Sequence, residues 1–161
     1  MASIHKDIRA ALEVHLSNQS GLPSIAYENV PFSPTTGQSY IQCRYIPTLR
    51  RPAVRGLNHQ QRSDGVFQML VYSPEGTGPA TAEGYVDTLL EAFEATTHIY
   101  WDIVDERLLT EQEAFIVTES GSKLLATNAI SVSIDYAERQ QGFLDTPWYY
   151  IPVDIGWYTY K

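Results

Sequence analysis

The stretch "RSDGVFQMLVYSPEGTGPATAEGY", residues 62–85, runs from an apolar segment through a glycine-rich turn into a helical pattern. The segment 66–72 has the length and the apolar and aromatic content of a buried strand. Behind the turn, apolar residues recur at helical spacing and predict a helix with one inward face. This inward stripe consists of Ala82, Tyr85, Val86, Leu89 and Phe93. This stretch therefore predicts one strand joined by a turn to one helix.

Many nucleotide-binding sites also begin with a strand, a glycine-rich turn and a helix. A P-loop needs a lysine after its last glycine, but residues 7–122 contain no lysine. Gly76 and Gly78 are followed by Pro79, and the third glycine of a dinucleotide fingerprint is missing. The turn is instead expected to start the helix, with Gly78 as its cap, Pro79 at the first helical position and Glu83 near the positive helix end.

Upstream of this unit, a first amphipathic helix is expected at the amino terminus, ended by Gly21 and Pro23. Its apolar positions are Ile4, Ile8, Ala11, Leu12 and Leu16. Two strands are expected over 24–30 and 39–46, on either side of a turn rich in proline. The second strand alternates, and its predicted inward side chains are Ile41, Cys43 and Tyr45.

Between the predicted strands, residues 47–63 show no convincing period and are expected to form a long arginine-rich loop. No acidic residue occurs between Glu28 and Asp64. The arginines of this part of the chain are Arg44, Arg50, Arg51, Arg55 and Arg62. Cationic charge is thus concentrated in one segment of a chain whose net charge is −8.

The opposite charge gathers on the outward face of the second helix. This acidic row consists of Glu83, Asp87, Glu91 and Glu94. The helix offers no lysine or arginine to relieve it, and like charges at i and i+4 are mildly destabilising. The row is either a solvated face or a surface that meets a cationic partner.

Downstream, strands are expected over 114–120, 129–138 and 148–160. In the last strand, alternation places Tyr149, Ile151, Val153 and Ile155 on the core side. Its other aromatic rings favour core or subunit contacts, with ligand stacking as the alternative. The predicted order α-β-β-β-α-β-β-β indicates one α+β domain over 1–161, with two main helices packed on a mainly antiparallel β-sheet.

Composition and motifs exclude several classes of function. The negative charge argues against a general nucleic-acid binder, and no apolar stretch is long enough to span a membrane. Cys43 is the single cysteine, which leaves no internal disulfide and favours an intracellular protein. The histidines are scattered, and no nucleophile motif is present. We therefore expect no enzyme, and no catalytic, metal or cofactor-binding residues.

In order and content, these elements resemble the tail-terminator (tail completion) proteins of long non-contractile-tailed phages, the lambda-like terminator family. The resemblance covers nearly the whole chain and is carried by the amino-terminal helix, "SYIQCRYIP", "RSDGVFQMLVYSPEGTG", "AEGYVDTLLEAF" and "WYYIPVDIGWY". Its most specific positions are Arg62, Gly65, Pro74, Gly76 and Gly78.

The resemblance implies a structural protein of the virion that is assembled in the host cytoplasm and located at the neck end of the tail. Such proteins form a ring, usually a hexamer, that binds the last ring of the tail-tube protein, stops polymerisation and offers its other face to the head–tail connector. DNA passes through the channel without specific binding, and a negative net charge fits that need. Because fold alone does not fix function, another neck, head-completion or tail-tube protein of the same fold remains the alternative, followed by a cytosolic adaptor and a nucleotide-handling enzyme.

Within such a ring, the two charged features are candidate contact surfaces. Arg50, Arg51, Arg55 and Arg62 would meet either the acidic row of the next subunit or an acidic patch of a tube or connector protein, since a guanidinium pairs carboxylates in a bidentate manner. Lining of the channel, with weak contact to DNA phosphates, is another alternative, and a solvated loop is the third.

Overall fold

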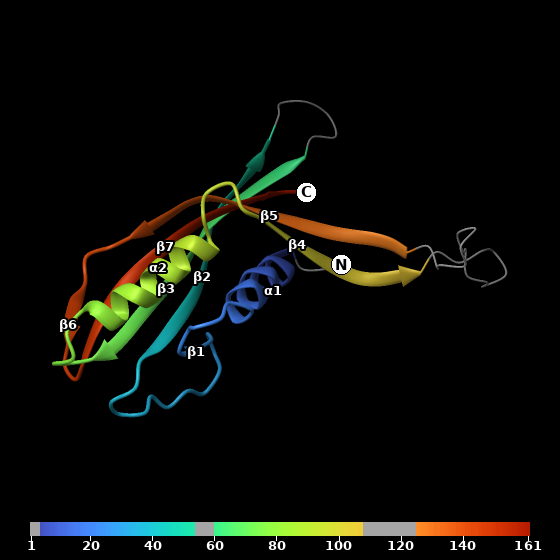
Figure 1. Ribbon diagram of the computed structural model, residues 1–161. Helices are drawn as coiled ribbons and strands as arrows, with labels where there is room; N and C mark the ends of the chain where they lie inside the picture. Colours follow the sequence, from blue (N-terminus) through green and yellow to red (C-terminus); the bar gives the residue numbers. More distant parts are fainter. Residues whose placement is uncertain (1–3, 54–59, 108–124) are drawn as a thin grey trace.

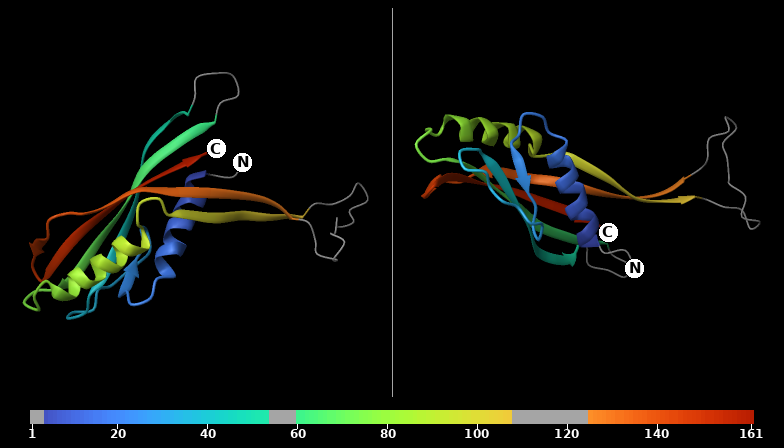
Figure 2. Two further views of the ribbon diagram at one scale, coloured as in Figure 1. Left: turned by 45° about the horizontal axis from the view of Figure 1, so that its top comes forward. Right: turned by 90° about the horizontal axis from the view of Figure 1, so that it is seen from below.

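The computed structural model describes residues 4–53, 60–107 and 125–161, without the side chains of 102–107 and 125–129. The elements in chain order are α1 (Ile4–Ser17), β1 (Ser24–Ala26), β2 (Tyr40–Pro52), β3 (Gln61–Pro74), α2 (Ala80–Ala92), β4 (His98–Arg107), β5 (Leu125–Arg139), β6 (Phe143–Asp145) and β7 (Trp148–Tyr160). The α+β class is confirmed: two helices lie on one face of a mainly antiparallel sheet (Figures 1 and 2).

The sheet has the strand order β1-β2-β3-β7-β5-β4, and β6 adds a short antiparallel pair to β7. Only the β1–β2 pairing is parallel. β5 pairs with β7 from Ser133 onward, whereas its earlier residues pair with β4 alone. The β4–β5 and β2–β3 hairpins consequently extend in different directions past the helices (Figure 1).

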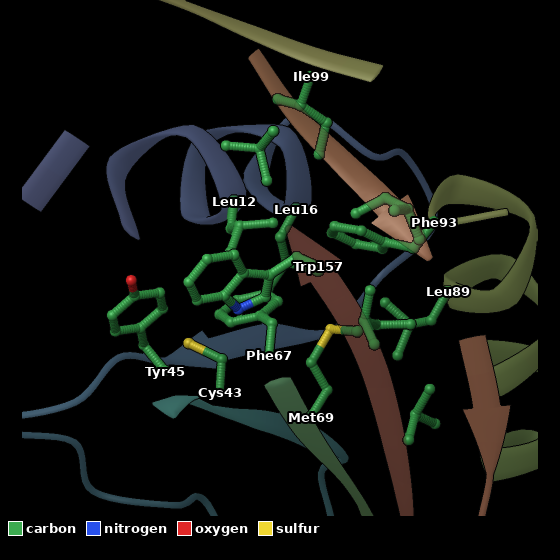
Figure 3. Close-up of a cluster of buried hydrophobic side chains, with 14 of the residues drawn as sticks. Leu12, Leu16, Cys43, Tyr45, Phe67, Met69, Leu89, Phe93, Ile99 and Trp157 are labelled. Carbon is green, nitrogen blue, oxygen red and sulfur yellow. The ribbon is translucent and has the colours of Figure 1, made fainter. Parts of the chain in front are cut away.

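The core lies between the two helices and the inner face of the sheet. All five predicted positions of α1 are buried, as are the inward residues of β2 and β7 apart from the partly buried Tyr149. Trp157 is 1% exposed and stacks on Tyr45, with ring centroids 5.3 Å apart (Figure 3). Fully burying one aliphatic or phenylalanine side chain contributes roughly 1.5–3 kcal/mol to the stability of the folded chain. Because the helices and the sheet share this core, its burial stabilises both of them.

Gly65 is required by that packing. It faces Trp157 in the β3–β7 register. A Cβ at Gly65 would clash with the indole ring and lie 2.6 Å from the carbonyl oxygen of Ile46. A side chain here would therefore displace the largest ring of the core.

Several predicted boundaries were wrong. Residues 47–52 and 61–63 belong to β2 and β3 rather than to a loop, because antiparallel pairing continues to Pro52 opposite Gln61. A register shift between Pro47 and Leu49 breaks the alternation by which a strand is recognised in sequence. β1 ends at Ala26, because the chain turns at Tyr27, whose carbonyl oxygen accepts a hydrogen bond from Val30.

Other differences concern the second half of the chain. β4 and β6 were not predicted, and the strand expected over 114–120 lies outside the described residues. A register shift between Ile134 and Tyr136 leaves Tyr136 42% exposed, with its ring over Gly156.

Candidate functional site

The arginines predicted as a loop occupy the far end of the β2–β3 hairpin, and Arg55 lies outside the described residues. Arg51 pairs in register with Arg62, so their side chains extend from neighbouring strands. We call Arg50, Arg51 and Arg62 the arginine tip. Figure 1 shows this end of the hairpin extending away from α2.

Asp64 partly neutralises the arginine tip. Its carboxylate accepts a hydrogen bond of 2.6 Å from Nε of Arg62 and lies 3.9 Å from Nε of Arg51. The guanidinium of Arg62 also lies 4.4 Å from the ring centroid of Tyr158. The hydrogen bond to Asp64 raises the pKa of Arg62, so this side chain stays charged. Arg50 forms no ion pair with any residue that the structure describes.

The acidic row is divided in the folded chain. Glu83 is paired with Arg139 of β5, a partner that its own helix could not supply. Asp87, Glu91 and Glu94 are exposed and have no ion pair within the described part of the chain. Together with Leu90, they line a shallow depression of about 350 Å³. Three carboxylates are therefore available to a partner.

The face of the sheet that carries no helix holds a feature that the sequence did not reveal. Tyr40, Tyr72, Tyr150 and Phe143 are direct register partners on β2, β3, β7 and β6. Their ring centroids lie 4.5, 5.2 and 5.6 Å apart along this row, which we call the aromatic ladder. Each of the four residues occupies an outward-facing position of its own strand. Only the register between the strands brings the four rings together.

The ladder is poorly suited to stacking on sugars or bases. The rings of Tyr40 and Tyr72 are nearly parallel, at 4°, so their faces cover each other. Stacking on a ligand needs exposed ring faces, whereas a stacked row turns its edges and hydroxyl groups toward solvent. Of the carboxy-terminal rings considered for ligand stacking, Trp157 is buried in the core. The geometry favours contact with protein.

The glycine-rich turn borders an apolar pocket of about 340 Å³. It is lined by Pro74, Gly76, Gly78, Pro79, Leu144 and Tyr149, none of which carries a charge suited to a phosphate. The predicted cap was displaced by one residue: Pro79 is the N-cap, because its carbonyl oxygen accepts the first helical bond, from Glu83. Gly78 precedes it with φ of +80°, a left-handed conformation that favours glycine.

The residues that most often carry chemistry have structural partners. Cys43 is buried, and its thiol lies 3.6 Å from the carbonyl oxygen of Ala26. Burial raises the pKa of this thiol to about 12, which leaves it protonated and inert at neutral pH. His15 and His98 contact the carbonyl oxygen of Ala92 and the hydroxyl of Ser133. The described residues contain no group of three or more side chains arranged to hold a metal ion.

Comparison with solved structures supports the fold described above. A solved structure superposes with a TM-score of 0.63 at 19% identity, covering 99% of this chain and 97% of the other, which shows a shared fold. No curated protein matches. No helix of the described chain has the length and apolar content to cross a membrane.

A family profile described as "Phage tail terminator protein" matches residues 7–157. Of the elements in the described residues, the match includes both helices beyond the first turn of α1 and all seven strands except the end of β7. Proteins of this family have a structural role in assembly of the phage tail and are located in the virion tail. The chain belongs to the phage tail terminator protein family.

Proposed function

We propose that this chain forms a closed ring, most simply a hexamer, on the last ring of the tail tube. The ring ends polymerisation of the tube protein, and its other face joins the tail to the head–tail connector. The family assignment supplies the tail role, and the distribution of charge supports assembly from several copies.

One observation carries the proposal. The exposed part of the acidic row is negative and Arg50 is positive, and neither forms an ion pair within the described chain. The row follows α2, whereas Arg50 lies at the far end of the β2–β3 hairpin, which extends away from α2 (Figure 1). Surfaces that cannot meet within one subunit can meet between subunits, and a heterologous contact closes into a ring when the rotation permits. Arginines at the tip are suited to carboxylates of the next subunit, the tube protein or the connector.

The net charge of −8 is compatible with a channel through which DNA passes. A negative field repels phosphates and so prevents the ring from holding the DNA in place. The ring therefore needs no sequence-specific or tight contact with DNA, and we assign none.

Tail assembly with and without this chain tests the function. Negative-stain images are expected to show tails of uniform length when the chain is present and overlong tubes when it is absent. Light scattering measures the mass of the purified protein and of the capping assembly. A head-completion protein would leave tail length unchanged, and a tube protein would polymerise alone, so either result would overturn the proposal.

A further inference from the structure

The face that bears the aromatic ladder also carries a cation, Arg44. Arg44 follows Tyr40 by four residues on β2, so both side chains extend from the helix-free face. Arg44 is exposed and forms no ion pair with a described residue. The charge of Arg44 acts on Tyr72: it lowers the pKa of the Tyr72 hydroxyl, whereas burial raises it by more. Arg44 therefore lies on the same face as the ladder, four residues along β2 from Tyr40.

The ladder adds hydrogen-bond donors to this cation. The hydroxyl groups of Tyr40, Tyr72 and Tyr150 have no hydrogen-bond partner among the described side chains of the molecule. Burial raises the pKa of Tyr40 and of Tyr72, so both hydroxyls remain protonated at neutral pH. A partner for this face should accordingly offer hydrogen-bond acceptors to the tyrosine hydroxyls and a negative charge to Arg44. The carboxylate of Asp154, on the same face, is already bound by Gln68 and Gln140. Tyrosine and arginine are the residue types enriched at the centres of protein interfaces.

The outer face of α2 has that chemistry. Asp87 and Glu91 on α2 and Glu94, two residues beyond its end, offer six carboxylate-oxygen acceptors. Asp87 and Glu91 lie about 6 Å apart along the helix axis at 1.5 Å per helical residue. The distance from Tyr40 to Arg44 along β2 is about 13 Å at 3.3 Å per strand residue. The carboxylates of the acidic row are thus complementary to the hydroxyl groups of the ladder and to the guanidinium of Arg44.

The two surfaces also point in opposite directions from one layer of the fold. α2 packs on β3 and β7, and Tyr72 and Tyr150 extend from the other face of the same two strands. One copy stacked behind another would consequently place the outer face of α2 against the ladder of its neighbour. Each copy would use a different surface on each side, and such a head-to-tail contact closes into a ring when the rotation between neighbouring copies permits it.

We propose that the aromatic ladder and Arg44 form the docking surface for the acidic row of a second copy of this chain. The proposal rests on the proposed ring and assigns its subunit contact. The negative charge of Asp145 on β6 contributes to raising the pKa of Tyr40 and of Tyr72, after the larger effect of burial, and it would repel the acidic row from that end of the ladder toward Arg44. The arginine tip is then left for the tube or connector protein.

Cysteine cross-linking tests the contact in assembled rings or capped tails. Glu91→Cys is made in one preparation and Gln42→Cys, between Tyr40 and Arg44, in another. A short bismaleimide is expected to link copies only when the two preparations are mixed, because the contact joins different surfaces. Cys43 is buried and does not compete for the reagent. Lys6→Cys on the exposed part of α1, mixed with Glu91→Cys, is the matched control and should give no link.

A charge exchange provides a second test. Arg44→Glu should lower ring formation by about tenfold or more through like-charge repulsion, without loss of folding. Adding Glu91→Arg to the same chain should restore it. Assemblies that show no mixed cross-link, or that tolerate Arg44→Glu, would overturn the docking surface alone. A chain that neither forms rings nor limits tail length would overturn the proposed function as well.

Discussion

Arg139 on β5 donates two hydrogen bonds to the carboxylate of Glu83 on α2, one of them 3.0 Å long. This pair fixes the first turn of α2 to the sheet and separates Glu83 from the rest of the acidic row. The residues of the row are therefore expected to respond differently to neutralisation.

Glu83→Gln should lower the stability of the subunit slightly, because it removes the bidentate partner of Arg139. Glu91→Gln should raise it by about 0.2–0.5 kcal/mol, because it relieves repulsion from Asp87 and Glu94. Urea denaturation at low and moderate salt measures both effects. Equal effects of the same sign would show that Glu83 and Glu91 lie in equivalent environments.

Replacing Arg50, Arg51 and Arg55 together by serine should leave folding nearly unchanged. Among the described residues, the substitution removes only one ion pair, the 3.9 Å contact between Arg51 and Asp64. Exposed ion pairs contribute about 0.2–1 kcal/mol to folding stability. Joining to heads and capping of tubes should decrease instead, as measured from particle yield and tail length.

Lys6→Ser is the matched control for loss of an exposed cation elsewhere. Normal capping and joining by the arginine variant would mean that the arginine tip makes no assembly contact. Normal assembly with altered retention of packaged DNA would place these arginines in the channel.

Gly65→Ala should lower the free energy of unfolding by about 1–3 kcal/mol, since the new methyl group overpacks the core against Trp157. Gly84→Ala is the matched control, because nothing lies within 4 Å of its Cβ position inside α2. It should stabilise the chain by about 0.5–1 kcal/mol through helix propensity. Thermal unfolding of both variants would refute this account if Gly65→Ala were neutral.

Stability should decrease as pH rises above 9. Burial raises the pKa of Cys43 from 9.0 to about 12, so the folded chain holds this proton more tightly than the unfolded chain does. A raised pKa contributes stability below pH 9 that is lost as pH approaches 12. Urea denaturation between pH 7 and 10 should show this decrease, and Cys43→Ala should reduce it between pH 9 and 10. An unchanged slope in the variant would assign the effect to the buried tyrosines.

A second titration concerns Glu13 on α1. Burial raises its pKa, against the opposing charge of Arg9. The charged carboxylate is therefore less favourable in the folded chain, and stability is lost as pH rises through this raised pKa. Glu13→Gln should be more stable than the parent chain at pH 7 and lose that advantage near pH 4. A constant difference at both pH values would indicate a packing effect.

The helices and the inward faces of the strands could be predicted because each depends on periodicity within one short segment. Ile8 and Leu12 on α1 and Ile151 and Val153 on β7 are examples. The aromatic ladder could not be predicted in this way, because Tyr40 and Tyr150 are brought into one row only by the register of β2, β3 and β7. Long-range register depends on the whole sheet and leaves no mark in local sequence.

The partners of the charged residues were hidden for the same reason. Arg139 is 56 positions from Glu83, and the link between them depends on how α2 lies against β5. Asp64 is close to Arg62 in sequence, but its approach to Arg51 depends on the β2–β3 hairpin. The arginine segment resembled a loop because Pro47, Pro52 and the register shift disrupt strand alternation.

The position of β7 has a consequence for biosynthesis. β7 follows every other strand in the chain, yet it separates β3 from β5 and also pairs with β6. During translation the two sides of the described sheet have no shared strand until β7 leaves the ribosome, so this sheet cannot close before β7 has been made. A nascent chain interrupted before Trp148 lacks the central strand. Under the proposed function, a copy that lacks β7 has no complete sheet and would not cap a growing tube.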